Sequence, residues 1–154
     1  MSYAIVTGAS AGIGKEIAIQ LAERGHNIIL TARRENRLQE LASDIRSRYQ
    51  VNVDYITADL AEVDAPEQIH EFCKNNNYDV EILINNAGYG LPKPFHEVPM
   101  EDEEKSLRVL AISVIALTKK FVPDLLARGG GKVMIVSSVA STVAAILNLV
   151  KQFN

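Results

Sequence analysis

The sequence predicts an α/β fold in which helices cover both faces of one parallel sheet. Short apolar runs alternate along the chain with longer segments whose apolar residues recur every three or four positions. Such alternation of strands and helices is typical of parallel sheets built from right-handed crossovers. Most of the strand runs are continuously apolar, which indicates burial of the sheet on both faces. A glycine-rich turn, TGASAGIG at residues 7–14, joins the first strand to the first helix.

The elements follow in order and end at recognisable signals. Strands are expected at residues 3–6, 27–32, 51–57, 80–84 and 133–136. Helices are expected after the glycine turn, from about residue 35 to 49, from Pro66 onwards, and between the proline-rich loop 88–99 and the three glycines at 129–131. The chain shows no internal repeat or linker, so residues 1–154 are predicted to form one domain.

Helical spacing also predicts which side chains are buried. In the first helix Ile13, Ile17 and Leu21 recur every four residues with Ala18 and Ala22 beside them, which predicts one buried face. The buried stripe expected in the long helix consists of Leu107, Leu110, Val114, Leu117 and Phe121.

An atypical amphipathic tail is expected over residues 139–154. Its apolar positions at helical spacing are Val143, Ile146, Leu147, Val150 and Phe153. Without a neighbour, the strand at 133–136 would end the sheet with an exposed apolar edge. We therefore expect the tail to pack over this edge, or two copies of the chain to meet there as a homo-oligomer.

Composition narrows the function classes. A net charge of -3 and a pI near 5.6 provide no basic surface, so nucleic acid is not an expected partner. The longest near-apolar run, at 109–117, is much shorter than the ~20 residues that cross a membrane, and the first strand leaves no room for a signal peptide. The single Cys73 in a helical pattern indicates a reduced thiol and a cytoplasmic chain. The three histidines are scattered, so no metal is expected.

The glycine turn predicts a dinucleotide site. Gly8, Gly12 and Gly14 allow the backbone to turn tightly and to approach a pyrophosphate closely. The first N–H groups of the following helix and its dipole favour the same negative charge. The alternative is a glycine-rich loop that binds no ligand, but the sequence of strand, turn and helix favours the dinucleotide.

The spacing T-G-x-x-x-G-x-G resembles that of the short-chain dehydrogenase/reductase family. Asn85-Asn86-Ala87-Gly88 and Val136-Ser137-Ser138 also match family motifs and stand in the same order, so the resemblance extends over nearly the whole chain. It implies a Rossmann-type sheet of about five strands in the order 3-2-1-4-5. It also implies an oxidoreductase that transfers hydride between NADP(H) and a carbonyl or alcohol group of a small molecule. Compared with the family, this chain is C-terminally incomplete.

Two arginines bear on the choice of cofactor. Arg33 and Arg34 follow the second strand, about twenty residues after the glycine turn, where an acidic residue would hold the ribose 2′-hydroxyl of NAD. A 2′-phosphate would be favoured there instead, and Arg33 resembles the 2′-phosphate ligand of NADP-preferring members. The alternative is a pair of solvated charges at a helix start, where the dipole would be unfavourable to them.

The resemblance implies further cofactor contacts. Asp59 matches the position whose carboxylate takes the adenine amino group, with the Leu60 backbone beside it; the alternative is a helix N-cap. Asn86 and its neighbours match the segment that lines the ribose and steadies the strand. The full set of expected cofactor-binding residues is Gly8, Ser10, Gly12, Ile13, Gly14, Arg33, Asp59, Leu60, Asn86, Ala87 and Gly88.

The catalytic residues match only in part. The family delivers a proton from a tyrosine, whose pKa is lowered by a lysine four residues later. Ser138 matches the serine that orients the substrate oxygen, but the tyrosine position is Lys151 and the lysine position would be residue 155. Leu110 occupies the position of the asparagine that holds a relay water. We therefore expect impaired catalysis; the alternative is a silent dinucleotide-binding module or a truncated product of a reductase gene.

One further pattern is set aside. Tyr89 and Lys93 have the spacing Y-x-x-x-K, but Gly90, Pro92 and Pro94 prevent the helix that would bring them onto one face. The one role we expect for Tyr89 is to line the cofactor cleft.

Overall fold

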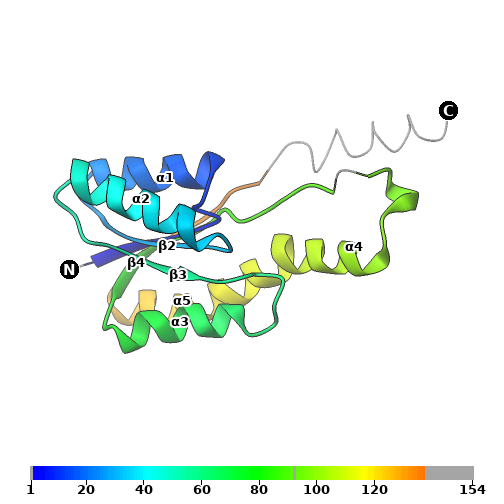
Figure 1. Cartoon of the computed structure of the whole chain (residues 1–154). Coiled ribbons are helices and arrows are strands. Elements are labelled where there is room, and N and C mark those ends of the chain that lie inside the picture. The colour runs from blue at the N-terminus through cyan, green and yellow to red at the C-terminus, as the bar shows by residue number, and fades with distance from the viewer. Residues whose placement is uncertain (1, 92, 138–154) are drawn as a thin grey trace.

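The computed structural model describes residues 2–91 and 93–137, and it has the predicted architecture (Figure 1). The parallel strands are β1 (Ser2–Thr7), β2 (Asn27–Ala32), β3 (Val53–Thr57), β4 (Asp79–Asn85) and β5 (Lys132–Ile135). Their order in the sheet is β3-β2-β1-β4-β5, which confirms the predicted order. The α-helices are α1 (Gly12–Glu23), α2 (Glu35–Arg48), α3 (Ala65–Asn75), α4 (Met100–Leu107) and α5 (Ser113–Ala127).

Two apolar cores flank the sheet because successive strand residues point to opposite faces. On one face Val6, Leu30 and Ile84 pack with α1 and α2. On the other face Ile5 and its neighbours pack against α3 and α5. Figure 1 shows these two helix pairs on opposite sides of the strands. Burial on both faces explains why the strand sequences are continuously apolar.

The buried face of α1 agrees with the prediction only in part. Gly14, Ala18 and Ala22 are buried, whereas Ile13 is 65% exposed and Ile17 is only partly buried. Small side chains allow the helix axis to approach the sheet, so the larger residues lie at the flanks of the contact. The burial of Ala18 and Ala22 confirms this part of the predicted face, and the prediction was wrong for Ile13.

The predicted long helix contains a π-helical turn, η2 (Arg108–Ile112), between α4 and α5. The backbone N–H of Ser113 donates to the Arg108 carbonyl five residues earlier, and the Ser113 hydroxyl donates to the Val109 carbonyl at 2.8 Å. This wider turn places one extra residue in the helix and breaks its α-helical periodicity. Val109 is therefore buried, whereas Leu107 and Leu110 are 61% and 50% exposed.

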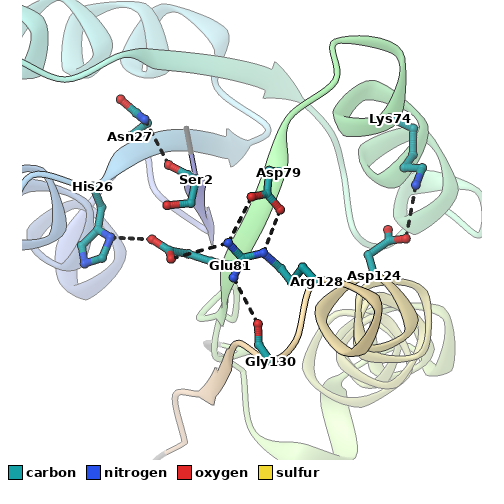
Figure 2. Close-up of polar contacts among 9 residues, drawn as sticks. All are labelled: Ser2, His26, Asn27, Lys74, Asp79, Glu81, Asp124, Arg128 and Gly130. Carbon is teal, nitrogen blue, oxygen red and sulfur yellow. Dashed lines mark hydrogen bonds and ion pairs between the residues drawn. The ribbon is translucent and has the colours of Figure 1, made fainter.

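A polar network joins the ends of α1 and α5 to β4 (Figure 2). Arg128 donates from Nε and Nη2 to the carboxylate of Asp79 at 2.7 and 3.0 Å, and from Nη1 to the Gly130 carbonyl. Glu81 lies 4.0 Å from Arg128 and 2.8 Å from Nδ1 of His26. These contacts link the two helix layers through the amino-terminal end of β4.

The last strand of the described chain is exposed. Its three apolar residues, Val133, Met134 and Ile135, are 39%, 48% and 56% exposed, and in the described chain β5 pairs with β4 alone. The tail predicted over residues 139–154 lies outside the described residues. Within residues 2–91 and 93–137, no helix has the length and apolar character needed to span a membrane.

We predict that Arg128→Gln loses less stability in acid than the unmodified chain does. The hydrogen bond from Arg128 lowers the pKa of Asp79. Burial alone would raise the pKa of Glu81, but hydrogen bonds from Ser2 and His26 and the Arg128 charge outweigh burial and lower it. A lowered folded-state pKa stabilises the fold above the unfolded pKa of about 4, and this contribution is lost as the pH falls through the folded value.

Urea unfolding measured between about pH 7 and pH 3 tests this prediction. As the pH is lowered, the unfolding free energy of the unmodified chain should decrease, and that of Arg128→Gln should decrease less. Lys119→Gln is the control, since it removes an exposed α5 cation that has no carboxylate partner in the described part of the chain. Parallel pH profiles for Arg128→Gln and the unmodified chain would contradict the assignment.

Candidate functional site

A cavity of about 210 Å³ lies at the carboxyl ends of the strands, beside the glycine turn. The chain reverses its direction across the sheet between β1 and β4, and ligands of open α/β sheets bind outside the strand ends at such a point. The volume is below the ~300–1,000 Å³ of whole small-molecule pockets, so the cavity would hold only part of a dinucleotide. The expected cofactor-binding residues that line it are Gly8, Ser10, Arg33, Asp59, Leu60, Ala87 and Gly88.

The glycines of the turn are needed for different structural reasons. A Cβ at Gly8, where φ is +66°, would lie 2.8 Å from the Ala87 Cα, and one at Gly14 would lie 2.5 Å from the Gly8 carbonyl oxygen. Both positions therefore exclude a side chain because the turn packs against itself and against the end of β4. Gly12 has a φ of +56° and no atom within 4 Å of a built Cβ, so its surface is open to a ligand.

The start of α1 is suited to an anion. Its first turn contains no acidic side chain, and no side chain caps its free N–H groups. Unpaired N–H groups and the positive end of the helix dipole favour a phosphate at this position. Gly12, Ile13 and Gly14 contribute this helix start and lie outside the lining of the cavity.

Thr7 and Asn86 hold the glycine turn against β4. The Thr7 hydroxyl donates to the Ile84 carbonyl at 3.2 Å and accepts from the N–H groups of Asn86 and Ala87 at 2.9 and 3.0 Å. The Asn86 side-chain nitrogen donates to the carbonyl oxygens of Thr7 and Gly8 at 2.9 and 3.4 Å. These contacts support the steadying role expected of Asn86, while its contact with a ribose stays a prediction. Sequence reasoning missed the role of Thr7.

The two arginines after β2 occupy the same cavity but differ in their partners. Arg34 donates from Nη2 and Nε to the Ser10 hydroxyl at 2.9 and 3.3 Å. Arg33 lies 3.9 Å from a carboxylate oxygen of Asp59, and its guanidinium carbon lies 5.7 Å from the centre of the Tyr89 ring. Arg34 has a neutral partner there and Arg33 a single distant carboxylate, so the site favours an anionic ligand.

The helix-cap alternative for Asp59 is wrong. Its carboxylate accepts a hydrogen bond from the Ala61 N–H at 3.0 Å, in a turn that precedes α3. That helix begins at Ala65, after Asp64. One oxygen of Asp59 thus shapes the turn, and the other faces Arg33 at the cavity.

Leu110 lies beside the site rather than on the buried stripe of its helix. A Cβ built at Gly88 would lie 2.9 Å from Cδ2 of Leu110, and the leucine side chain is half exposed. The π turn accounts for this placement, because it rotates Leu110 away from the stripe that contains Val109 and Leu117. A hydrocarbon side chain at this rim can exclude water but cannot relay a proton.

The remaining predictions concern the catalytic serine, a metal site and the proton-donating tyrosine. Ser138, the expected substrate-orienting serine, lies outside the described residues. No group of three or more His, Cys, Asp or Glu side chains in the described part of the chain is arranged to hold a metal ion. The chain has five tyrosines, and none follows Tyr89 in the sequence.

The strand, glycine turn and helix, together with a cavity at the strand ends, define a dinucleotide-binding α/β domain. The chain belongs to the short chain dehydrogenase family, whose profile matches residues 2–150.

Curated relatives are described as very-long-chain 3-oxoacyl-CoA reductases. The protein from Phaeosphaeria nodorum is 32% identical over 141 residues, which cover 89% of this chain and 41% of the relative. The protein from Vanderwaltozyma polyspora is 38% identical over 116 residues, covering 73% of this chain and 32% of the relative. The chain therefore spans less than half the length of these relatives.

Solved structures of the family superpose closely. An alcohol dehydrogenase from Thermococcus sibiricus complexed with 5-hydroxy-NADP has a TM-score of 0.84 and 31% identity, over 93% of this chain and 60% of that one. L-sorbose reductase from Gluconobacter frateurii, complexed with NADPH and L-sorbose, has a TM-score of 0.87 and 30% identity, over 99% and 59%.

We predict that Gly14→Ala disrupts the site and lowers stability by about 1–3 kcal/mol, the typical cost of overpacking. Alanine normally favours a helix by about 1 kcal/mol over glycine, so the sign of the change is diagnostic. The clash arises with the Gly8 carbonyl and with the Asn86 side chain. Urea unfolding measures the effect, and Gly90→Ala, which meets no atom within 4 Å, is the control. A Gly14→Ala chain as stable as the unmodified one would contradict the close approach.

Proposed function

We propose that this chain is the NADP(H)-binding part of a short chain dehydrogenase that transfers hydride between NADP(H) and a carbonyl or alcohol group of a small molecule. The observation that carries the proposal is the pair of arginines after β2, which line the cavity beside the glycine turn. A carboxylate at this strand end would hold the ribose 2′-hydroxyl of NAD, and it is absent. The complexes of related enzymes with NADPH and 5-hydroxy-NADP support the same cofactor.

The donors present fit this cofactor. The open N–H groups at the start of α1, next to Gly12, would hold the pyrophosphate. Arg33 would hold the 2′-phosphate, and Asp59 with the Leu60 backbone would meet the adenine. Bound NADPH supplies the hydride in such a reaction, while the residues of this chain bind and orient it.

We further propose that the 154 residues by themselves reduce carbonyl substrates slowly or not at all. Lys151 occupies the position of the proton-donating tyrosine, and no tyrosine follows Tyr89. Leu110 lies at the rim of the site and offers no polar atom to a relay water. The second candidate, a silent dinucleotide-binding module, is favoured by this same combination of an intact cofactor cavity and missing proton donors.

The cellular setting is also a proposal. Cys73 is buried, and burial raises the pKa of its thiol to about 12, so the thiol stays protonated. A single inert thiol fits a reducing compartment, and we propose a cytoplasmic location.

The exposed apolar edge of β5 supports self-association as a homo-oligomer.

We predict that NADPH binds more tightly than NADH and that Arg33→Ala removes the difference. A charge-assisted contact with the 2′-phosphate should contribute about 1.5–3 kcal/mol, or roughly 10- to 150-fold in affinity. Titration calorimetry measures both affinities. Arg37→Ala is the matched control, because Arg37 is an exposed α2 arginine that pairs with Glu40 and lies outside the cavity. Equal affinities of the unmodified chain for NADPH and NADH would refute the assignment of Arg33.

We also predict no saturable oxidation of NADPH by the chain with aldehydes, ketones or diketones. A positioned general acid contributes typically ~10²–10⁴-fold, and the hydroxyl of Ser138 is too weak an acid to replace a phenol. Absorbance of NADPH follows the reaction. Turnover that saturates with substrate and disappears in Ser138→Ala would show that another proton donor completes the site.

A further inference from the structure

We propose that Tyr89 is one wall of the adenine site, so that the base binds between the Tyr89 ring and the Arg33 guanidinium. The proposal rests on the proposed function, because it requires a nucleotide in the cavity beside the glycine turn. It assigns an affinity-determining contact to a residue outside the three motifs that link the chain to its family.

The two groups come from different strands and meet across the same cavity. Arg33 follows β2 and Tyr89 follows β4, and both side chains line the 210 Å³ space. The guanidinium carbon lies 5.7 Å from the centre of the Tyr89 ring. Tyr89 is half-buried, whereas 63% of the Arg33 side chain is exposed. The Tyr89 ring is thus held by its surroundings, whereas the exposed Arg33 side chain is able to move.

The separation is close to that needed by a planar base. Two stacking contacts of about 3.5 Å require about 7 Å between the flanking groups. A shift of Arg33 by roughly 1–1.5 Å would open this space. Little opposes the shift, since the one ion pair of Arg33 in the described chain is with Asp59 at 3.9 Å. The shift would also release Asp59 to accept from an amino group of the base.

A weaker role for Tyr89 is a resting place for Arg33 in the absence of nucleotide. The ring would then compete with the ligand for the guanidinium, and its removal would leave affinity unchanged or increase it. Stacking of a base on an aromatic ring instead contributes about 5- to 150-fold in affinity. The two roles therefore predict opposite effects of removing the ring.

Calorimetry with NADPH and with 2′,5′-ADP, which keeps the adenine and both phosphates but lacks the nicotinamide, tests the proposal. Tyr89→Leu should weaken the binding of both ligands at least fivefold, and Tyr89→Phe should stay within about twofold of the unmodified chain. The preference for NADPH over NADH should persist in Tyr89→Leu, because Arg33 remains. Phe95→Leu, which removes an exposed aromatic ring outside the cavity, is the control.

A spectroscopic readout separates stacking from an indirect effect on folding. The chain contains no tryptophan, so tyrosine dominates its emission. Adding 2′,5′-ADP should quench part of this emission in the unmodified chain and not in Tyr89→Phe, although Tyr89→Phe still binds.

Undiminished affinity in Tyr89→Leu, or equal quenching in Tyr89→Phe, would overturn the role of Tyr89 alone. Failure of the unmodified chain to bind either ligand would overturn the proposed function and this inference together.

Discussion

The candidate site depends on the close contact between the glycine turn and the end of β4. The Thr7 hydroxyl and the Asn86 side chain form this contact with main-chain groups of both strands, at distances from 2.9 to 3.4 Å. A side chain at Gly8 or Gly14 would occupy the same space. Because buried polar groups require partners, these hydrogen bonds and the absence of side chains act as one unit. This unit aims the start of α1 and positions the segment from Ala87 to Tyr89 beside the cavity.

The charged groups differ between the two ends of the parallel strands. At the carboxyl ends of the strands, open N–H groups and two arginines create a region that favours anions. At the amino-terminal ends, Arg128 is neutralised by Asp79 and Glu81, and Asp124 is bound by His70 and Lys74. The helix dipole favours cations near a helix C-terminus, so Lys74 in the last turn of α3 and Arg128 at the end of α5 stabilise the helix ends opposite the site. Arg33 and Arg34 at the carboxyl ends of the strands thus remain available to an anionic ligand, whereas Arg128 is already paired.

Local apolar patterns predicted the strands and helices, and the family resemblance predicted the strand order. Seven of the expected cofactor-binding residues line one cavity, and the errors have physical reasons. Helical spacing assigns Ile13 to the buried face, whereas the close approach of α1 to the sheet buries Gly14 in the first turn and leaves Ile13 exposed. Leu110 was placed on a buried stripe because nothing in the sequence marks a π turn. Tyr89 was assigned to the cleft, but its contact with Arg33 joins residues 56 positions apart and no spacing rule reveals it.

The π turn bears on the proposed loss of catalysis in this chain. It places Leu110 half exposed beside Gly88, at the rim of the cavity. A side chain at this position lies next to the cavity, and a leucine contributes no polar atom there. The groups that we propose to bind the cofactor are the glycine turn, the two arginines and Asp59, and Leu110 is not among them. Under the proposed function, the nucleotide cavity can therefore remain intact while proton transfer is lost, since different atoms serve the two tasks.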